Sequence, residues 1–415
     1  MENITLLIEN AGQILTCAAG ADDLVGAKSG CLVAVAGDRI AAVGTRAEIA
    51  AAHDLGGAQV IDAQGGLVMP GFVDCHTHLV FHKSRVEEYS QKVQGRTPAE
   101  IKATGIPTGI SATAKMMREA SHGDLADSAA ERLAQMLSFG TTTVESKSGY
   151  GLNTATEIKM LEVNQMLGER QPIEIISTFL GAHEFPDDKS REAYIAEILD
   201  EMIPEVARRG LAEFNDVYCD DGYYTVEESR KILQVGLDHG LKVKIHTDAY
   251  SHIGGSTLAA EMKAISADHM NHTDPAEYPL LRDAGVVCVV MPALDFAVGH
   301  ARPFDARGLM DAGVTVALAT DMCPGCWLES MPFVVQLACR LYQFSPAEAI
   351  LAGTRHAAMS VDRADRIGSL EAGKQADIAI FPYARYEDMA YQLGRGRARM
   401  VLKAGAVVFD AGDSL

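Results

Sequence analysis

The two ends of the chain share a pattern of short apolar runs separated by turn residues. ITLLIEN, CLVAVAGDRIAAVG and AQVIDAQGGLVMPG occur near the start, and GSLEAGKQADIAIF and ARMVLKAGAVVFDA occur near the end. Short apolar runs bounded by Gly, Asp and Asn are typical of β-strands. Because both ends have this pattern and the middle does not, we expect the termini to pair into one small sheet domain.

The middle of the chain alternates strand-like apolar runs with stretches of helical spacing. The helix-like TATEIKMLEVNQMLGER precedes the strand-like IEIISTFLGAH, and VEESRKILQVGLDHG precedes LKVKIHTDAY. PLLRDAGVVCVVMPAL and ARGLMDAGVTVALATDM each combine a helix end, a glycine turn and a buried strand. A repeated strand–helix unit predicts an α/β protein with a parallel sheet. The length of the repeat fits an eightfold TIM barrel better than an open sheet, and no GxGxxG motif follows the first strand to indicate dinucleotide binding.

Composition and charge narrow the classes of partner. The 415 residues are 48% hydrophobic and 22% charged, as in ordinary globular proteins. The formal net charge of −20 would repel nucleic acid and anionic membranes, and no apolar stretch approaches the ~20 residues of a membrane span. Eight cysteines are scattered along the chain without an export signal. We therefore expect a reduced, cytoplasmic protein that binds neither nucleic acid nor membrane.

The segment PGFVDCHTHLVF carries the first candidate chemistry. His76 and His78 are two residues apart in extended chain, so their side chains point to the same side. In a barrel that side is the interior, at the carboxyl ends of the strands where active sites form. Two convergent imidazoles favour a divalent metal site, although the pair alone could also be hydrogen-bonded structural histidines.

Further histidines and an aspartate follow other predicted strands. They are His183 in TFLGAHEFP, His246 in KVKIHTDAY, His269 in AISADHM and Asp321 in TVALATDMCPG. Each alone could be a core histidine or a helix-capping Asp, but their shared position at strand ends indicates one site. Together with the His76 and His78 pair, they can supply a set of three His and one Asp, which suits Zn²⁺ or Fe²⁺.

A metal site of this kind is suited to hydrolysis. A bound metal ion brings the pKa of water towards neutrality. A nearby Asp can take the proton and deliver it to a leaving nitrogen, and a further His can stabilise the developing oxyanion. The predicted reaction is metal-assisted hydrolysis of an amide, an amidine or a related C–N bond.

These segments together resemble the amidohydrolase superfamily and, within it, the imidazolonepropionase family. The resemblance spans nearly the whole chain, and SGYGL, LGAH and SADH are its narrowest motifs. It implies a TIM (β/α)8 barrel at 64–363 and a small β-sandwich made from 1–63 and 364–415. It also implies one divalent metal ion, Zn²⁺ or Fe, held by His76, His78, His246 and Asp321.

A second metal ion is not expected. Two-metal members of the superfamily bridge their ions with a lysine on the fourth strand, and IISTFLGAHEF, which we take as that strand, has no lysine. Lys147 lies nearby in sequence and is interpreted as a member of a structural ion pair.

The same resemblance implies roles for the residues around the metal. Arg85, Tyr150 and His183 would hold the substrate, and an Arg is suited to bidentate binding of a carboxylate. Asp321 would shuttle the proton, with His269 and His183 as the other catalytic side chains.

The implied substrate is a small carboxylate-bearing heterocycle. The expected reaction opens a ring C–N bond of 4-imidazolone-5-propionate and gives N-formimidoyl-glutamate in histidine degradation. A homodimer is the assembly expected from the frequency of twofold dimers.

The chain departs from the family pattern near the expected ring of the substrate. Ala249 stands where the family has an acid or an amide, three residues after the histidine of the fifth strand. Cys323-Pro-Gly-Cys326 replaces Asn-Pro-Gly-Ser/Thr and is followed by Trp327, the single tryptophan. We expect both cysteines to line the substrate pocket, since one CxxC without a second pair is weak evidence for a zinc or redox site.

These departures leave three alternatives open. A deaminase on the same scaffold is disfavoured, because Ala249 cannot protonate a ring nitrogen. The enzyme could hydrolyse a hydantoin- or thiohydantoin-5-propionate, attacking the carbon between the two nitrogens and releasing sulfide from a thioxo ring. A different class of protein, a metal-binding scaffold without catalysis, would follow if the change at Ala249 had abolished turnover.

Overall fold

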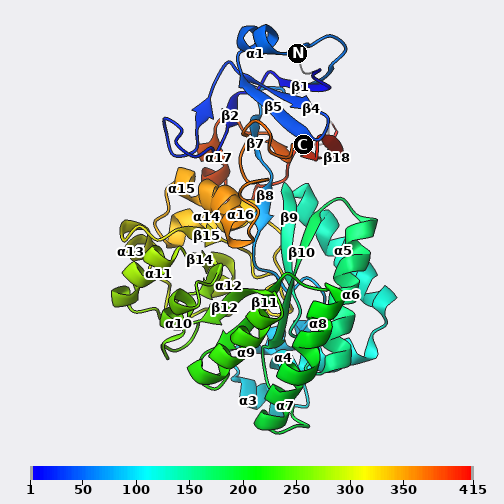
Figure 1. Ribbon diagram of the computed structural model, residues 1–415, viewed down its shortest axis with the longest axis vertical. Coiled ribbons are helices and arrows are strands. Elements are labelled where there is room, and N and C mark those ends of the chain that lie inside the picture. The colour runs from blue at the N-terminus through cyan, green and yellow to red at the C-terminus, as the bar shows by residue number, and fades with distance from the viewer. Residues whose placement is uncertain (1–2, 413–415) are drawn as a thin grey trace.

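Eight parallel strands form a closed barrel in the computed structural model, which describes residues 3–412 (Figure 1). Each strand pairs with the next in chain order. The first and last are joined by a parallel bridge between Thr77 and Met322 and by two hydrogen bonds from Thr320 to Asp74. The barrel strands are β8 (Phe72–Asp74), β9 (Thr141–Lys147), β10 (Glu174–Ala182), β11 (Phe214–Cys219), β12 (Lys242–Thr247), β13 (Ser266–His269), β14 (Val287–Val290) and β15 (Val316–Leu318). The predicted α/β class and TIM barrel are confirmed.

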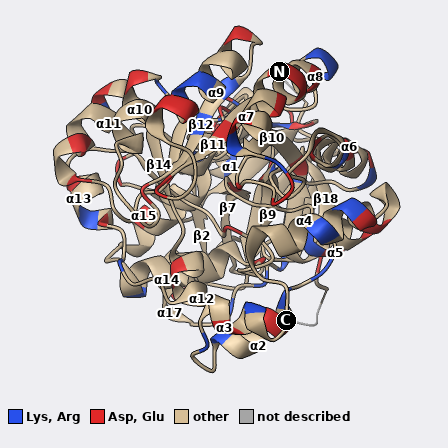
Figure 2. Cartoon of the chain, turned by 90° about the horizontal axis from the view of Figure 1, so that it is seen from below, with Lys and Arg blue, Asp and Glu red and all other residues tan. Residues whose placement is uncertain are grey.

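Helices surround the barrel strands and carry most of the charged residues visible in Figure 2. The helix expected from TATEIKMLEVNQMLGER is α6, which begins where the Asn153 side chain accepts a hydrogen bond from the backbone N–H of Thr156. Among the described residues, no helix is long and apolar enough to cross a membrane. The helices of this region are α2 (Val86–Lys92), α3 (Pro98–Ala103), α4 (Gly109–Glu119), α5 (His122–Ser138), α6 (Thr154–Arg170), α7 (Arg191–Glu197), α8 (Ile203–Arg209), α9 (Val226–Asp238), α10 (Gly255–Glu261), α11 (Tyr278–Ala284), α12 (Pro292–Val298), α13 (Ala306–Asp311), α14 (Met331–Leu341), α15 (Pro346–Leu351) and α16 (Ala357–Ser360). Two π-helical segments, η1 (Ile198–Met202) and η3 (Ala352–His356), and one 3-10 helix, η2 (Pro275–Glu277), adjoin them.

The chain termini build two further sheets at one end of the barrel (Figure 1). The smaller sheet has the order β5-β4-β1-β6, and the larger has the order β18-β17-β16-β7-β2-β3. The strands are β1 (Leu6–Glu9), β2 (Gln13–Leu15), β3 (Ala27–Lys28), β4 (Leu32–Ala36), β5 (Arg39–Gly44), β6 (Gln59–Asp62), β7 (Leu67–Pro70), β16 (Ile378–Phe381), β17 (Met400–Lys403) and β18 (Ala406–Asp410), with helices α1 (Arg46–Ala52) and α17 (Tyr386–Tyr391) beside them. The predicted sheet domain formed by both termini is confirmed.

Side chains that alternate between two hydrophobic cores attach this small domain to the barrel. On β7, Val68 packs into the core shared by the two terminal sheets, whereas Leu67 and Met69 belong to the core of the barrel. On β16, Ile380 and Phe381 divide in the same way. Successive side chains of a strand point to opposite faces, so the central strands β7 and β16 of the larger sheet are buried on both faces.

The strand count corrects one expectation from the sequence. IISTFLGAHEF, which we took as the fourth barrel strand, contains β10, which is the third. The fourth strand is β11, FNDVYC, which is polar on both faces: Asn215 donates to the carbonyl of Ile232 on α9, while Asp216 points into the barrel interior. The sequence of β11 therefore lacks the apolar run that marks a buried strand. It contains no lysine either, so the expectation of a single metal ion does not change.

Gly140 allows the barrel to approach the terminal sheets closely. It follows α5 with φ +88, and a Cβ there would lie 2.6 Å from the ring of Phe381. Gly240 follows α9 with φ +85, and a Cβ there would have no atom within 4 Å. We expect Gly240→Ala to lower the free energy of unfolding by about 1 kcal/mol through left-handed strain alone. Gly140→Ala should lower it by ~2 kcal/mol more, because the added methyl group overpacks the interface. Parallel thermal unfolding of the two variants measures the difference, and equal losses would contradict this packing argument.

Candidate metal centre and active site

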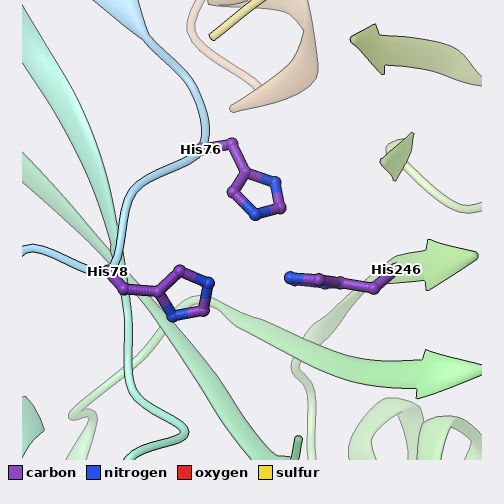
Figure 3. Close-up of side chains that lie close together, drawn as sticks. All are labelled: His76, His78 and His246. Atoms are coloured by element: carbon purple, nitrogen blue, oxygen red, sulfur yellow. The ribbon is translucent and has the colours of Figure 1, made fainter. Parts of the chain in front are cut away.

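Four of the predicted site residues meet at the carboxyl ends of the barrel strands. His76 and His78 follow β8, His246 lies near the end of β12, and Asp321 follows β15. Figure 3 shows the imidazoles of His76, His78 and His246 turned towards a common point, and their ligand atoms lie within 4.8 Å of one another. Oδ1 of Asp321 is 3.8 Å from Nε2 of both His76 and His78.

The atoms that face this point are buried without hydrogen-bond partners. They are Nε2 of His76, Nε2 of His246 and Oδ1 of Asp321. Buried polar atoms are nearly always paired in proteins, so orphaned ones indicate a bound group. Imidazole nitrogens with one carboxylate oxygen are donors typical of Zn²⁺ and Fe²⁺. The residues present therefore fit a divalent metal ion.

Burial sets the charge of these side chains. It lowers the pKa of His76, His78 and His246 well below the usual value, so their rings are neutral, as metal ligands must be. Burial also raises the pKa of Asp321 to about 7, against the opposing effect of Lys147. A divalent cation beside Asp321 would favour its ionised form.

Two buried carboxylates contact the outer nitrogens of the histidine rings. Oδ2 of Asp268 forms a hydrogen bond of 2.7 Å with Nδ1 of His76. Oδ2 of Asp216 lies 3.0 Å from Nδ1 of His246 as a close polar contact, outside hydrogen-bond geometry. Carboxylates in such positions fix the tautomer and orientation of metal-binding histidines. Neither aspartate was expected at the site from the sequence.

The sequence does contain a pattern that points to these two aspartates. Charged residues interrupt the barrel strands VESK, FNDVYC, KVKIHT and SADH. In β12, Lys244 is two residues from His246 and so points to the same interior face. A charge at such a position is rarely buried unless it is paired, so this spacing could have identified the layer beneath the histidines.

His183 and Tyr150 lie beside His78. The rings of His183 and His78 stack at 4.8 Å with 8° between their planes. Nδ1 of His183 is 3.0 Å from the carbonyl of Gly149, so Nδ1–H donates there and Nε2 stays free. Tyr150 lies 5.2 Å from His78 and 5.3 Å from His183 between ring centroids. Burial lowers the pKa of His183 to about 4, which leaves its ring neutral.

His269 approaches the same centre from β13. Its ring centroid is 5.3 Å from that of His76 and 5.1 Å from that of His246, and it forms a close group with His76 and Asp321. Its backbone has φ +87, outside the usual range for a residue with a side chain. Strained backbone of this kind is concentrated at functional sites.

Arg85 meets the CPGC loop. A Cβ on Gly325 would lie 2.6 Å from Nη2 of Arg85, so the loop admits the guanidinium only because residue 325 has no side chain. Burial, and to a smaller extent the neighbouring Cys323, raises the pKa of Tyr150 well above its usual value. The structure thus brings Arg85, Tyr150 and Cys323 together, although they are far apart in sequence.

The two cysteines of this loop are part of a tight hairpin. Cys323 and Cys326 exchange backbone hydrogen bonds of 3.0 and 3.1 Å, and Sγ of Cys326 donates to the carbonyl of Thr320. Both thiols are buried, and burial raises the pKa of Cys323 to about 12. A buried thiol with a raised pKa is inert, which favours a lining role over a redox one.

Ala249, the departure from the family pattern on the fifth strand's loop, is buried. It lies three residues beyond His246 and is 3% exposed. Nε2 of His300 donates to its backbone carbonyl at 2.9 Å, and the preceding Asp248 has φ +54. Backbone conformation and this hydrogen bond fix the position of residue 249.

Comparisons with known proteins agree with this geometry. Residues 67–408 match the amidohydrolase family. Imidazolonepropionase of Geobacillus thermodenitrificans is 46% identical over 90% of this chain and 88% of that protein. Imidazolonepropionase of Shouchella clausii is 40% identical over 98% of this chain and 93% of that protein. The fold is similar to a zinc-bound adenosine deaminase from Xanthomonas campestris, with a TM-score of 0.73, 19% identity, and coverage of 99% and 94% of the two chains.

Proposed function

The chain belongs to the amidohydrolase family, and we propose that it hydrolyses a ring C–N bond of 4-imidazolone-5-propionate to give N-formimidoyl-glutamate. The observation that carries this proposal is the identity of 40–46% to imidazolonepropionases along almost the whole chain. The protein is a hydrolase acting on C–N bonds of cyclic amides, and its substrate is a small heterocycle.

We infer that His76, His78, His246 and Asp321 hold one divalent metal ion. Their unpaired buried atoms and their neutral imidazoles support this role. When bound, the ion would supply Lewis acidity for activating water and polarising the ring carbonyl. We propose Zn²⁺, since a set of imidazoles and one carboxylate suits it, with Fe²⁺ as the alternative.

Asp321 and His269 are proposed to carry the proton transfer and the orientation of the reacting groups. The carboxylate of Asp321 lies between two histidines and has an unpaired oxygen that can take a proton and return it to the leaving ring nitrogen. His269 is neutral and adjacent, so its ring can orient the water or hydrogen-bond the developing oxyanion.

Arg85, Tyr150 and His183 are proposed to bind the substrate. The Arg85 side chain is only slightly exposed, and its Nε lies 3.5 Å from Oε2 of Glu88 without forming a hydrogen bond. The guanidinium therefore keeps N–H donors for a propionate carboxylate. Nε2 of His183 is free because Nδ1 is bound to Gly149. Cys323 and Cys326 would line the same pocket.

A mass measurement tests the proposed function. We expect zinc-loaded protein to add one water to freshly prepared 4-imidazolone-5-propionate, and chelator-treated protein to leave it unchanged. Absence of product with stoichiometric zinc bound would contradict the proposal. Turnover of hydantoin- or thiohydantoin-5-propionate under the same conditions would then favour the alternative ring chemistry.

The remaining expectations stay predictions. They are a homodimeric assembly, a cytoplasmic location, and domain boundaries at 1–63, 64–363 and 364–415.

A further inference from the structure

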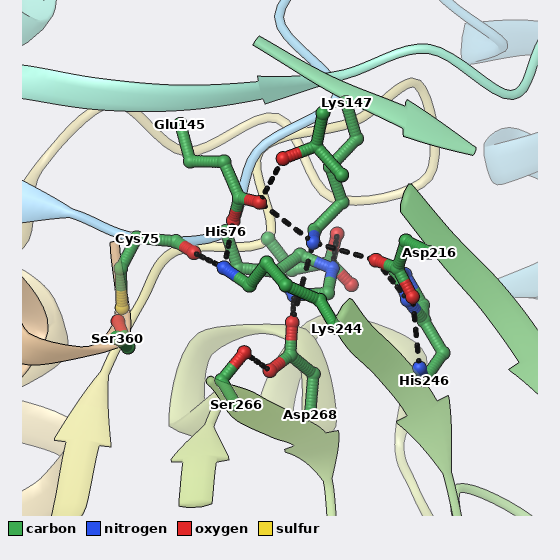
Figure 4. Close-up of polar contacts among 12 residues, drawn as sticks. Cys75, His76, Glu145, Lys147, Asp216, Lys244, His246, Ser266, Asp268 and Ser360 are labelled. Carbon is green, nitrogen blue, oxygen red and sulfur yellow. Dashed lines mark hydrogen bonds and ion pairs between the residues drawn. The ribbon is translucent and has the colours of Figure 1, made fainter. Parts of the chain in front are cut away.

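A network of charged side chains fills the barrel interior beneath the candidate metal site (Figure 4). It consists of Glu145 and Lys147 on β9, Asp216 on β11, Lys244 on β12 and Asp268 on β13. All five side chains are fully buried. The interior of a TIM barrel is normally filled by branched apolar residues, and buried ion pairs often stabilise a fold no better than apolar residues of similar size. Stability alone therefore does not explain this layer.

Lys147 is the centre of the network. Its Nζ lies 2.7 Å from Oδ2 of Asp216, 3.0 Å from Oε1 of Glu145 and 3.3 Å from Oδ2 of Asp268. The ammonium donates hydrogen bonds to Asp216 and Glu145 and forms an ion pair with Asp268, so three carboxylates surround its N–H groups. Because the three partners come from three strands, the position of the ammonium is fixed.

The two aspartate oxygens that contact Lys147 are also the oxygens that contact the histidines. Oδ2 of Asp268 is the atom 2.7 Å from Nδ1 of His76, and Oδ2 of Asp216 is the atom 3.0 Å from Nδ1 of His246. One ammonium thus connects two carboxylate–histidine pairs. The two histidines belong to different strands, and their ring centroids are 4.5 Å apart.

We propose that Lys147 is a positioning residue of the metal site, and that its ammonium holds Asp216 and Asp268 where they orient His76 and His246. This inference rests on the proposed function only in requiring that the histidines bind a divalent ion. It assigns Lys147 a role beyond the structural ion pair expected from the sequence.

Lys244 provides a matched comparison within the same network. It is as buried as Lys147, and its Nζ lies 2.7 Å from Oε2 of Glu145 and 3.4 Å from the carbonyl of Cys75. Among the described residues, the ion pairs of Lys244 include neither aspartate that contacts a histidine. Met is uncharged and similar in length to Lys, so either substitution removes one buried positive charge. Only Lys147→Met also removes the contacts that hold the two aspartates.

The test compares metal binding and metal geometry in these two variants. We expect Lys147→Met to weaken Zn²⁺ binding by about 10- to 100-fold in competition with a chromophoric chelator. We also expect it to shift the visible absorption bands of the Co²⁺-loaded protein. The Zn²⁺ affinity of Lys244→Met should be within threefold of that of the unchanged protein, and its Co²⁺ spectrum should be unchanged. We expect this even if its thermal unfolding temperature falls as much as that of Lys147→Met.

Equal Zn²⁺ affinities in the two folded variants would overturn the proposal, whatever their activity. This test can fail independently of the proposed function. The proposed function fails only if the zinc-loaded unchanged protein does not hydrolyse 4-imidazolone-5-propionate. Neither readout requires a substrate.

Asp268→Asn keeps the proposal testable if Lys147→Met does not fold. It preserves side-chain size and leaves Lys147 two carboxylate partners. We expect its Co²⁺ spectrum to change and its Zn²⁺ affinity to fall about tenfold, because His76 loses its charged partner. Where both single variants fold, their effects on Zn²⁺ affinity should be less than additive in the double variant, since the residues act through one contact. An unchanged affinity for Asp268→Asn, or strict additivity, would contradict the proposal.

Discussion

Asp321→Asn is expected to lower kcat, expressed per bound metal ion, by about 10³-fold. The asparagine has the same size and tolerates the left-handed backbone at this position, where φ is +48. Its amide cannot accept the proton that the carboxylate would take from water and pass to the ring nitrogen, a transfer that contributes roughly 10²- to 10⁴-fold to a rate. The measurement is kcat divided by metal content, because the change also removes a charged ligand.

Asp74 offers a matched control for this experiment. Burial raises the pKa of Asp74 to about 7, the same value as for Asp321. Both oxygens of Asp74 accept hydrogen bonds from Thr320, so this carboxylate is engaged at the joint between the first and last barrel strands. We expect Asp74→Asn to reduce stability while changing kcat per metal ion less than tenfold. If Asp321→Asn loses no more activity than Asp74→Asn, proton transfer does not depend on Asp321.

The sequence predicted those parts of the protein that local patterns encode. His246 and Asp321 end apolar runs, so their place at the mouth of the barrel followed from strand periodicity. The contact between His76 and Asp268 joins residues 192 positions apart, and no local pattern contains it.

The two features that the sequence pattern does not reveal have one physical cause, the burial of charge in the barrel. β11 was missed as the fourth strand because Asp216 occupies its interior face, and the network around Lys147 was missed because isolated charges are usually exposed. A strand with interior charges resembles a surface loop in sequence. It becomes recognisable only when its partners on neighbouring strands are known.

Ala249→Glu is expected to raise kcat on 4-imidazolone-5-propionate by about 100-fold. The family resemblance found in the sequence implies an acid or an amide at this position, facing the ring of the substrate. A carboxylate there can protonate or hydrogen-bond the amidine edge of imidazolone, and positioned proton transfer contributes roughly 10²- to 10⁴-fold. The structure fixes the backbone at residue 249 through the hydrogen bond from His300, so the new side chain would start from a defined position.

Ala249→Gln separates proton transfer from the size and polarity of the new side chain. Glutamine occupies the same volume as glutamate and can hydrogen-bond the ring, but it cannot donate a carboxyl proton. We expect kcat to rise less than tenfold in Ala249→Gln, with KM similar in the two variants and zinc content equal. Equal rates for the two variants would show that the carboxyl proton has no part in the reaction. If both variants were slower than the unchanged protein, the site would be matched to a ring without a basic nitrogen. Hydantoin-5-propionate, which has no amidine, would then be the faster substrate of the protein with alanine at this position.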